Sequence, residues 1–255
     1  MNDASAYAIV LGLATALAAG VVGSFGLMKR MTLAGDVVSH LALPGLGAAF
    51  LWKVNPIAGA AVTVALGIVL IHQLERRSGL AIETAIGVVF VAALAAGALL
   101  TPREDLIDAL FGGFGAIRTI ELAIGLLGCA AVIGTLYAMR HKLILIIFSP
   151  DIARSLKIDV DRVNFLYLCT FGATILIGLR FLGALLVGAM IIVPAATARR
   201  LATSLNRFIV LSAAISMLSV GAGFIAARYS HLALGPCIVG VASAMFALSL
   251  LKRGG

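Results

Sequence analysis

Long apolar runs, separated by short polar stretches, recur along the whole chain. Runs of about 18 residues or more are long enough to cross a bilayer. Inside lipid, every backbone N–H and C=O must find its partner within the protein, which favours helices, whereas a membrane β-barrel would show short segments of alternating polarity. The pattern therefore predicts an all-α polytopic membrane protein with nine spanning helices, or eight as the alternative. The nine predicted spans are residues 6–28, 31–52, 55–73, 80–101, 119–139, 163–179, 181–198, 208–227 and 232–251.

The basic residues orient these spans. If the spans alternate, fourteen of the 19 Lys and Arg residues fall on one side of the membrane. The positive-inside rule makes that side the cytoplasm, which places the N-terminus outside and the C-terminus inside. The first apolar run has no basic residue before it, which favours a retained helix over a cleaved signal peptide. No long polar stretch interrupts the spans, so we expect a single transmembrane domain over 1–255.

Composition excludes several other classes. Of the 255 residues, 62% are hydrophobic and only 12% charged, about half the charged fraction of a soluble domain. The net charge of +8 comes from short loops between spans, so we expect no nucleic-acid partner. The three cysteines are isolated within apolar segments and indicate no disulfide framework. The chain contains no G-x-x-x-x-G-K-[ST] motif, so a step driven by ATP would need another chain.

The second predicted span carries two ionisable residues. Asp36 and His40 are four residues apart, so a helix places them on one face. An ionisable side chain near the centre of a span costs about 2.5–3.5 kcal/mol, so the pair needs a partner or a polar cavity. Carboxylate and imidazole together are ligands of first-row transition metals. Two interpretations stay open: a metal site completed by the same pair from a second copy, or a buried Asp–His hydrogen bond that joins helices.

Two spans contain proline. Pro44 and Gly45 follow the acid–imidazole pair and are predicted to break or kink that helix, which would free carbonyl groups toward a pore. Pro194 is predicted to kink a later span. Such kinks also occur in helices that only pack.

The segment 102–118 is predicted to form a short outer helix or loop. It carries Glu104, Asp105 and Asp108, which form either an outer vestibule that attracts cations or a solvated loop. His231 lies at the outer edge of the last span and is a second candidate for a contact at the entrance.

The longest cytoplasmic segment, 140–165, contains a helix start at Ser149-Pro150-Asp151. Ser suits a cap, Pro the first helical position, and Asp the positive end of the helix dipole. We expect a short amphipathic helix over about 149–158. Its mixed charges argue against a purely lipid-bound helix, which would be mostly basic, and favour docking to a partner protein. The residues assigned to this contact are Ser149, Pro150, Asp151, Ile152, Ala153, Arg154 and Leu156.

These motifs together resemble, nearly end to end, the membrane permease subunit of bacterial ABC transporters for metal ions, the zinc/manganese/iron type. The pattern GD-x-x-SH-x-x-LPG combined with VG-AMIIVPAATAR is quite specific. The matching stretches are MTLAGDVVSHLALPGLGAAF at 31–50, ETAIGVVFVAALAAGALL followed by DLIDALFGGF at 83–114, SPDIARSLKID at 149–159, FLGALLVGAMIIVPAATARRL at 181–201, and LGPCIV at 234–239.

The resemblance implies a permease like those of type II ABC importers, in the bacterial cytoplasmic membrane. It implies a homodimer, or occasionally a heterodimer, together with two cytoplasmic ATPase subunits that bind the ATP and an extracytoplasmic metal-binding protein. The substrate would be zinc or manganese, or alternatively iron, with no resident cofactor. Asp36 and His40 would be ligands in the translocation path, and 149–156 the coupling helix. Glu83 stands where family members often have Asp, and we expect it to pair with the nearby arginines of 76–77.

Three other functions remain as alternatives. An ABC permease for a metal chelate or a vitamin would not need an ionisable pair at the centre of a span. A metal channel or secondary transporter would work without an ATPase. An intramembrane enzyme is disfavoured because the chain lacks HExxH and a GxSG nucleophile. Asp and His accept several metals, so the sequence does not choose among them.

Overall fold

The protein is described here by a computed structural model, which covers residues 3–31, 34–79, 81–100, 118–182, 184–230 and 232–251. Within these ranges the chain forms eleven helices and no strand, which confirms the all-helical prediction. The helices are α1 Asp3–Met28, α2 Ala34–His40, α3 Leu43–Leu51, α4 Pro56–Ser78, α5 Ile82–Leu100, α7 Thr119–Phe148, α8 Pro150–Ser155, α9 Val160–Leu182, α10 Ala184–Leu201, α11 Leu205–Ser230 and α12 Leu234–Leu251. In the described part of the chain, seven are long and apolar enough to cross a membrane: α1, α4, α5, α7, α9, α11 and α12.

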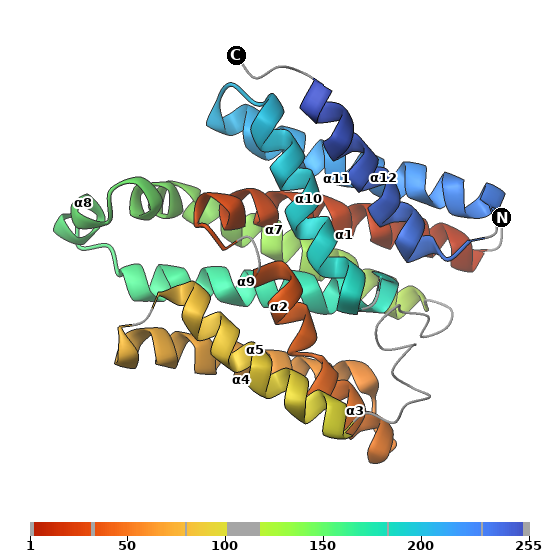
Figure 1. The fold of residues 1–255 in the computed structure, drawn as a ribbon, viewed down its shortest axis with the longest axis horizontal. Helices are drawn as coiled ribbons and strands as arrows, with labels where there is room; N and C mark the ends of the chain where they lie inside the picture. Colours follow the sequence, from red (N-terminus) through yellow and green to blue (C-terminus); the bar gives the residue numbers. More distant parts are fainter. Residues whose placement is uncertain are drawn as a thin grey trace.

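The helices form two groups around a central layer (Figure 1). The central helix α1 contacts α7, α9, α10 and α11. On one side lie α3, α4 and α5, and on the other lie α10, α11 and α12. The short helix α2 contacts α10 of the second group as well as α5 and α9. It therefore occupies the junction between the two groups.

The predicted second span, 31–52, is not one continuous helix. The first half, α2, ends at His40, and the second half, α3, begins at Leu43 with Pro44 in its first turn. Two backbone bonds of the i→i+3 type, from Leu41 to Val38 and from Ala42 to Ser39, both 3.2 Å, close the end of α2. A proline is tolerated in the first turn because its missing N–H would have no intrahelical partner there. The span is thus two short helices joined by a tight turn.

The helix α7 is longer than the span predicted at 119–139, and it continues to Phe148. The predicted span ends before the basic residues at 140–142, but the chain has no proline or glycine between them and Pro150. Leu143 and Ile146 are buried, so packing continues past the charged residues. Much of the predicted loop 140–165 is therefore helical.

A buried polar cluster connects α1 to α9. Lys29 Nζ donates a hydrogen bond of 2.6 Å to Asn164 Oδ1 and lies 5.0 Å from the centre of the Tyr167 ring. The Tyr167 hydroxyl in turn donates to the Val22 carbonyl at 3.1 Å. Burial lowers the pKa of Lys29 to about 8, and the charge of Glu75 opposes part of that shift. Lys29 therefore connects the end of α1 to α9, and its charged form is less well hydrated than in water, which is why its pKa is lowered.

An ion pair connects α4 to α9. Arg76 Nε lies 3.2 Å from Asp161 Oδ2, and both side chains are largely exposed, so the pair contributes little to stability. The predicted pairing of Glu83 with the arginines of 76–77 is not found among the described residues. Arg76 pairs with Asp161 of α9 instead.

Candidate functional site

Asp36 and His40 face one another at the helix junction. The His40 Nε2 atom lies 3.7 Å from Asp36 Oδ1, which is longer than a hydrogen bond. Two ligands of one tetrahedral zinc ion, each at about 2.0–2.2 Å, are separated by about 3.4 Å. A small rotation of either side chain would therefore let both atoms hold the same cation.

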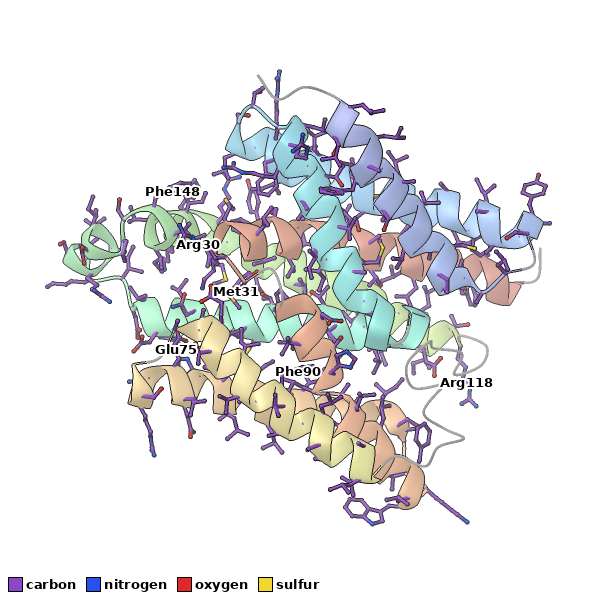
Figure 2. All side chains as sticks on the ribbon, viewed as in Figure 1. Arg30, Met31, Glu75, Phe90, Arg118 and Phe148 are labelled. Atoms are coloured by element: carbon purple, nitrogen blue, oxygen red, sulfur yellow. The ribbon has the colours of Figure 1, made fainter. Side chains whose placement is uncertain are left out.

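The two side chains differ in exposure. His40 is 12% exposed, whereas Asp36 is 50% exposed. The carboxylate can therefore meet an ion that arrives in water, while the imidazole is fixed within the protein. The His40 ring packs against Phe90 of α5, with ring centres 5.6 Å apart, at the point labelled in Figure 2. Its Nδ1 atom is buried and has no partner among the described residues, which leaves Nε2 as the nitrogen that faces Asp36.

The backbone of α2 at Asp36 touches the backbone of α10. A Cβ atom added to Gly188 would lie 2.6 Å from Asp36 Cα and 2.7 Å from Asp36 N. From the other side, a Cβ on Gly35 would lie 3.1 Å from the Gly188 carbonyl oxygen. Only a residue without a side chain permits this contact. Gly188 therefore fixes how far the carboxylate stands from α10.

One chain offers an incomplete ligand set. Within the described ranges, no third His, Cys, Asp or Glu joins Asp36 and His40. The remaining predicted entrance residues, Glu104, Asp105, Asp108 and His231, lie outside the described residues.

The other predicted helix-breaking residues have identifiable surroundings. Gly45 packs against Gly59 of α4 so closely that a Cβ on either residue would collide with the backbone of the other. Pro194 lies inside α10, two turns before its end, and is buried. Ala195 and Ala198 of the same helix are fully buried within this chain.

The predicted short helix is present as α8, at one extreme end of the molecule (Figure 1). Pro150 occupies its first turn, as expected, but the Ser149 side chain makes no capping bond; its carbonyl accepts from Ala153 N at 3.0 Å instead. Ala153 is buried, while Ile152 and Leu156 are exposed. Asp151 pairs with Arg154 at 3.4 Å. The helix therefore exposes apolar side chains at the protein surface, while its own Asp151 and Arg154 pair with each other.

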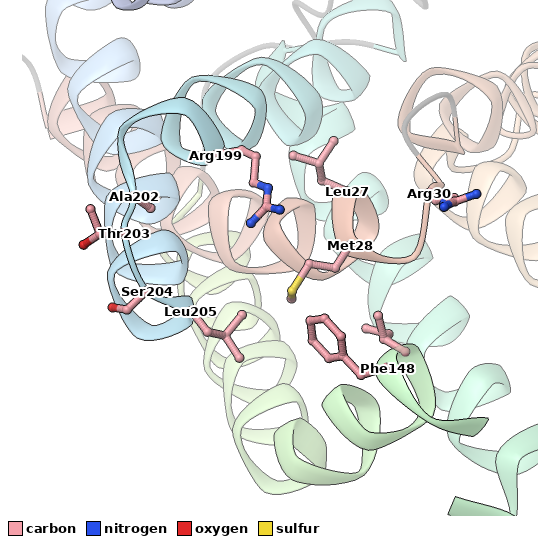
Figure 3. Close-up of a pocket in the computed structure, with 10 residues that line it drawn as sticks. Leu27, Met28, Arg30, Phe148, Arg199, Ala202, Thr203, Ser204 and Leu205 are labelled. Carbon is pink, nitrogen blue, oxygen red and sulfur yellow. The ribbon is translucent and has the colours of Figure 1, made fainter. Parts of the chain in front are cut away.

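A hollow of 450 Å³ lies between the C-terminal ends of α1, α7 and α10 and the start of α11. Figure 3 shows Arg199, from the last turn of α10, reaching toward Met28, with Phe148 facing it from the end of α7. Arg30 lines the rim and has a left-handed backbone, with φ 61°. Neither arginine belongs to an ion pair within the described residues.

Sequence reasoning missed two residues of the site. Gly188 lies within the pattern VG-AMIIVPAATAR, but its contact with Asp36 joins positions far apart in the chain. Phe90 lies in a uniformly apolar helix, where no pattern distinguishes it from its neighbours.

Comparison with known proteins shows the family and fold of the chain. The model of the ABC 3 transport family matches residues 1–253. The high-affinity zinc uptake system membrane protein ZnuB of Haemophilus influenzae is 31% identical over 252 residues, covering 96% of each chain. The manganese import system permease protein ScaB of Streptococcus parasanguinis is 30% identical over 246 residues, covering 95% of this chain and 88% of its own. Among solved structures, PsaBC from Streptococcus pneumoniae in complex with Fab matches with a TM-score of 0.82 and 28% identity, over 95% of this chain and 89% of that one.

The helical bundle, with a broken helix that carries an acid–imidazole pair at its centre, defines the class as a polytopic membrane transport protein. The chain belongs to the ABC 3 transport family.

Proposed function

We propose that the protein is the membrane-spanning permease subunit of an ATP-binding-cassette importer for a divalent transition metal. The observation that carries this proposal is the open Asp36–His40 pair, 3.7 Å apart on a broken helix between two helix groups. Similarity to a zinc uptake protein and to a manganese import permease supports the same substrate class. Zinc and manganese are the preferred substrates, with iron as the alternative.

The proposed topology has nine spans. The seven helices long enough to cross a membrane are joined by α10 and by the broken pair α2–α3. The distribution of basic residues supports an outside N-terminus and a cytoplasmic C-terminus in the bacterial cytoplasmic membrane. This orientation puts α8 and the hollow at the C-terminal ends of α1, α7 and α10 in the cytoplasm.

A homodimer would complete the metal site. One chain contributes two ligands among its described residues, and a twofold axis beside α2 would bring together two carboxylates and two imidazoles. Such a set suits tetrahedral zinc, or manganese and iron with added water. Mixed nitrogen and oxygen ligands bind these ions less tightly than a thiolate cage, which favours release during transport.

Energy would reach the site from a separate ATPase dimer. The exposed Ile152 of α8 and the exposed Leu156 directly after it support a role for this segment as the coupling helix. Because α2 lies between the two helix groups, a movement of one group relative to the other would open the pair to one side of the membrane at a time. Pro44, Gly45 and Pro194 would mark the flexible points. An extracytoplasmic metal-binding protein would deliver the ion near Glu104, Asp105, Asp108 and His231.

The test is ATP-dependent uptake of zinc, manganese and iron by the permease–ATPase complex in vesicles. Asp36→Asn removes the charge at nearly constant volume, and Glu83→Gln makes the same change at an exposed carboxylate of α5. We expect uptake to be lost in the first variant and retained in the second, with both complexes assembled. Normal uptake by Asp36→Asn, or uptake without the ATPase, would contradict the proposal.

A further inference from the structure

A second feature shares no lining residue with the Asp36–His40 pair. A groove of 300 Å³ runs between α1, α7 and α11. Its walls are almost entirely apolar, with Phe25 at its base and Ile133 and Val210 on its sides. Arg140 and Asn206 are its polar members. The volume is at the lower end of the range for small-molecule sites, roughly 300–1,000 Å³.

The groove opens toward lipid. Tyr137 of α7 and Val210 of α11 line it and are 66% and 67% exposed. Both belong to helices that are long and apolar enough to cross a membrane. The tyrosine lies one turn from the arginine, and such amphipathic side chains are enriched where lipid headgroups begin. An occupant must therefore be apolar along the groove and polar at the arginine.

Among the described residues, Arg140 has free hydrogen-bond donors that can bind an anion. The Arg140 guanidinium lies 4.5 Å from the centre of the Tyr137 ring, and its Nε donates to His141 Nε2 at 3.2 Å. Its two terminal nitrogens have no acceptor among the described residues, and Arg140 takes part in none of the ion pairs found there. A guanidinium with both terminal nitrogens free is suited to two parallel bonds with one phosphate.

The first turn of α11 adds a second attraction for negative charge. Asn206 is the second residue of this 26-residue helix, so its backbone N–H has no intrahelical acceptor. A helix N-terminus favours anions through these amides and the helix dipole. Here it shares one groove with a guanidinium that forms no ion pair among the described residues, and the two features together favour an anionic group such as a phosphate.

We propose that this groove binds an anionic phospholipid of the cytoplasmic leaflet, with the phosphate on Arg140 and Asn206 and an acyl chain along Phe25 and Val210. The inference rests on the proposed orientation but not on the metal site, since no residue is shared between them. Basic pockets between helices on the cytoplasmic side are known to select anionic headgroups.

The test compares two lipids on the full-length chain purified in neutral detergent. Phosphatidylglycerol and phosphatidylcholine with identical acyl chains are titrated, and retained lipid is counted by native mass spectrometry. We expect phosphatidylglycerol to be retained at about five- to tenfold lower concentration. Glycerol 3-phosphate, which has the phosphate without the chains, should not compete at those concentrations. Equal retention of the two lipids, or competition by glycerol phosphate, would overturn the proposal.

Substitutions then assign the preference to the groove. Arg140→Gln should reduce phosphatidylglycerol retention to the level of phosphatidylcholine. Arg140→Lys keeps the positive charge but loses the two parallel N–H donors of the guanidinium, so it should retain part of the preference. Arg77→Gln is the matched control, because Arg77 is an exposed arginine in the last turn of α4, outside the groove. Val210→Trp, which fills the groove without changing charge, should reduce retention of both lipids. An equal effect of Arg77→Gln would show a general charge effect and contradict the assignment.

A protein helix is the rival occupant of the groove. Val210→Cys in a chain whose three native cysteines are replaced by serine tests it by cross-linking in native membranes. We expect no cross-link between copies, because lipid fills the groove. A disulfide between two copies would make the groove a protein interface and overturn the proposal.

Discussion

Gly188 of α10 lies directly against the backbone of Asp36, so that an added Cβ would stand 2.6 Å from the Asp36 Cα atom. The contact ties the position of a proposed metal ligand to the position of helix α10. It predicts that Gly188 is a positioning residue for the carboxylate, although it contributes no atom to the ion.

The Gly188→Ala variant should raise the metal concentration for half-maximal uptake on the order of tenfold, because small displacements of a binding group weaken it strongly. Gly35→Ala, whose added Cβ meets the Gly188 carbonyl at a looser 3.1 Å, should have a smaller effect in the same direction. The measurement is the concentration dependence of uptake in vesicles.

The control for this prediction is Gly223→Ala, in which the added Cβ would collide equally with Ile238 between α11 and α12, at 2.5 Å. It should lower thermal stability as much as Gly188→Ala does while leaving the half-maximal concentration unchanged. Equal shifts in both variants would mean that Gly188 acts through packing alone.

The exposed side chains of α8 give a second prediction. Ile152→Glu places a charge on the apolar surface of this helix and should weaken association with the ATPase by about tenfold or more, as expected for a central contact residue. The fold should persist, since Ile152 is 53% exposed. The measurement is the amount of ATPase that copurifies.

Leu251→Glu is the corresponding control, because Leu251 is also exposed and lies at the C-terminal end of α12, on the same proposed side of the membrane. If it reduces copurification as much as Ile152→Glu does, α8 is not the specific contact.

Lys29 predicts a pH effect on stability. Its pKa is lowered from 10.5 to about 8 in the folded protein, so between these values the unfolded chain binds more protons. Stability should therefore rise with pH across about pH 8 to 10.5, and Lys29 contributes no slope below that window, where both states are protonated. The thermal midpoint of the wild type relative to Lys29→Met should increase in this window. A constant difference from pH 7 to 10 would contradict the shifted pKa.

Sequence periodicity was sufficient to place Asp36 and His40 on one face, because their relationship is local and depends only on helix geometry. It was also sufficient to identify the short helix at Pro150, where the helix start has a distinctive composition. It failed at the end of α7, since the charged residues at 140–142 resemble a membrane boundary while Leu143 and Ile146 continue to pack.

Long-range partners were not accessible from the sequence. Arg76 pairs with Asp161 of α9 instead of its neighbour Glu83, because tertiary packing decides which acid is near. Similarly, nothing local in the sequence indicates that Gly188 packs against Asp36, because the two residues are about 150 positions apart.

In the proposed homodimer, two copies of the chain share one cation between their acid–imidazole pairs. Metal content of the purified dimer, measured together with the X-ray absorption spectrum of bound zinc or manganese, tests it most directly. The account predicts one ion per two permease chains, with both nitrogen and oxygen ligands, and loss of that ion in His40→Ala. One ion in each chain, or full occupancy after His40→Ala, would contradict it.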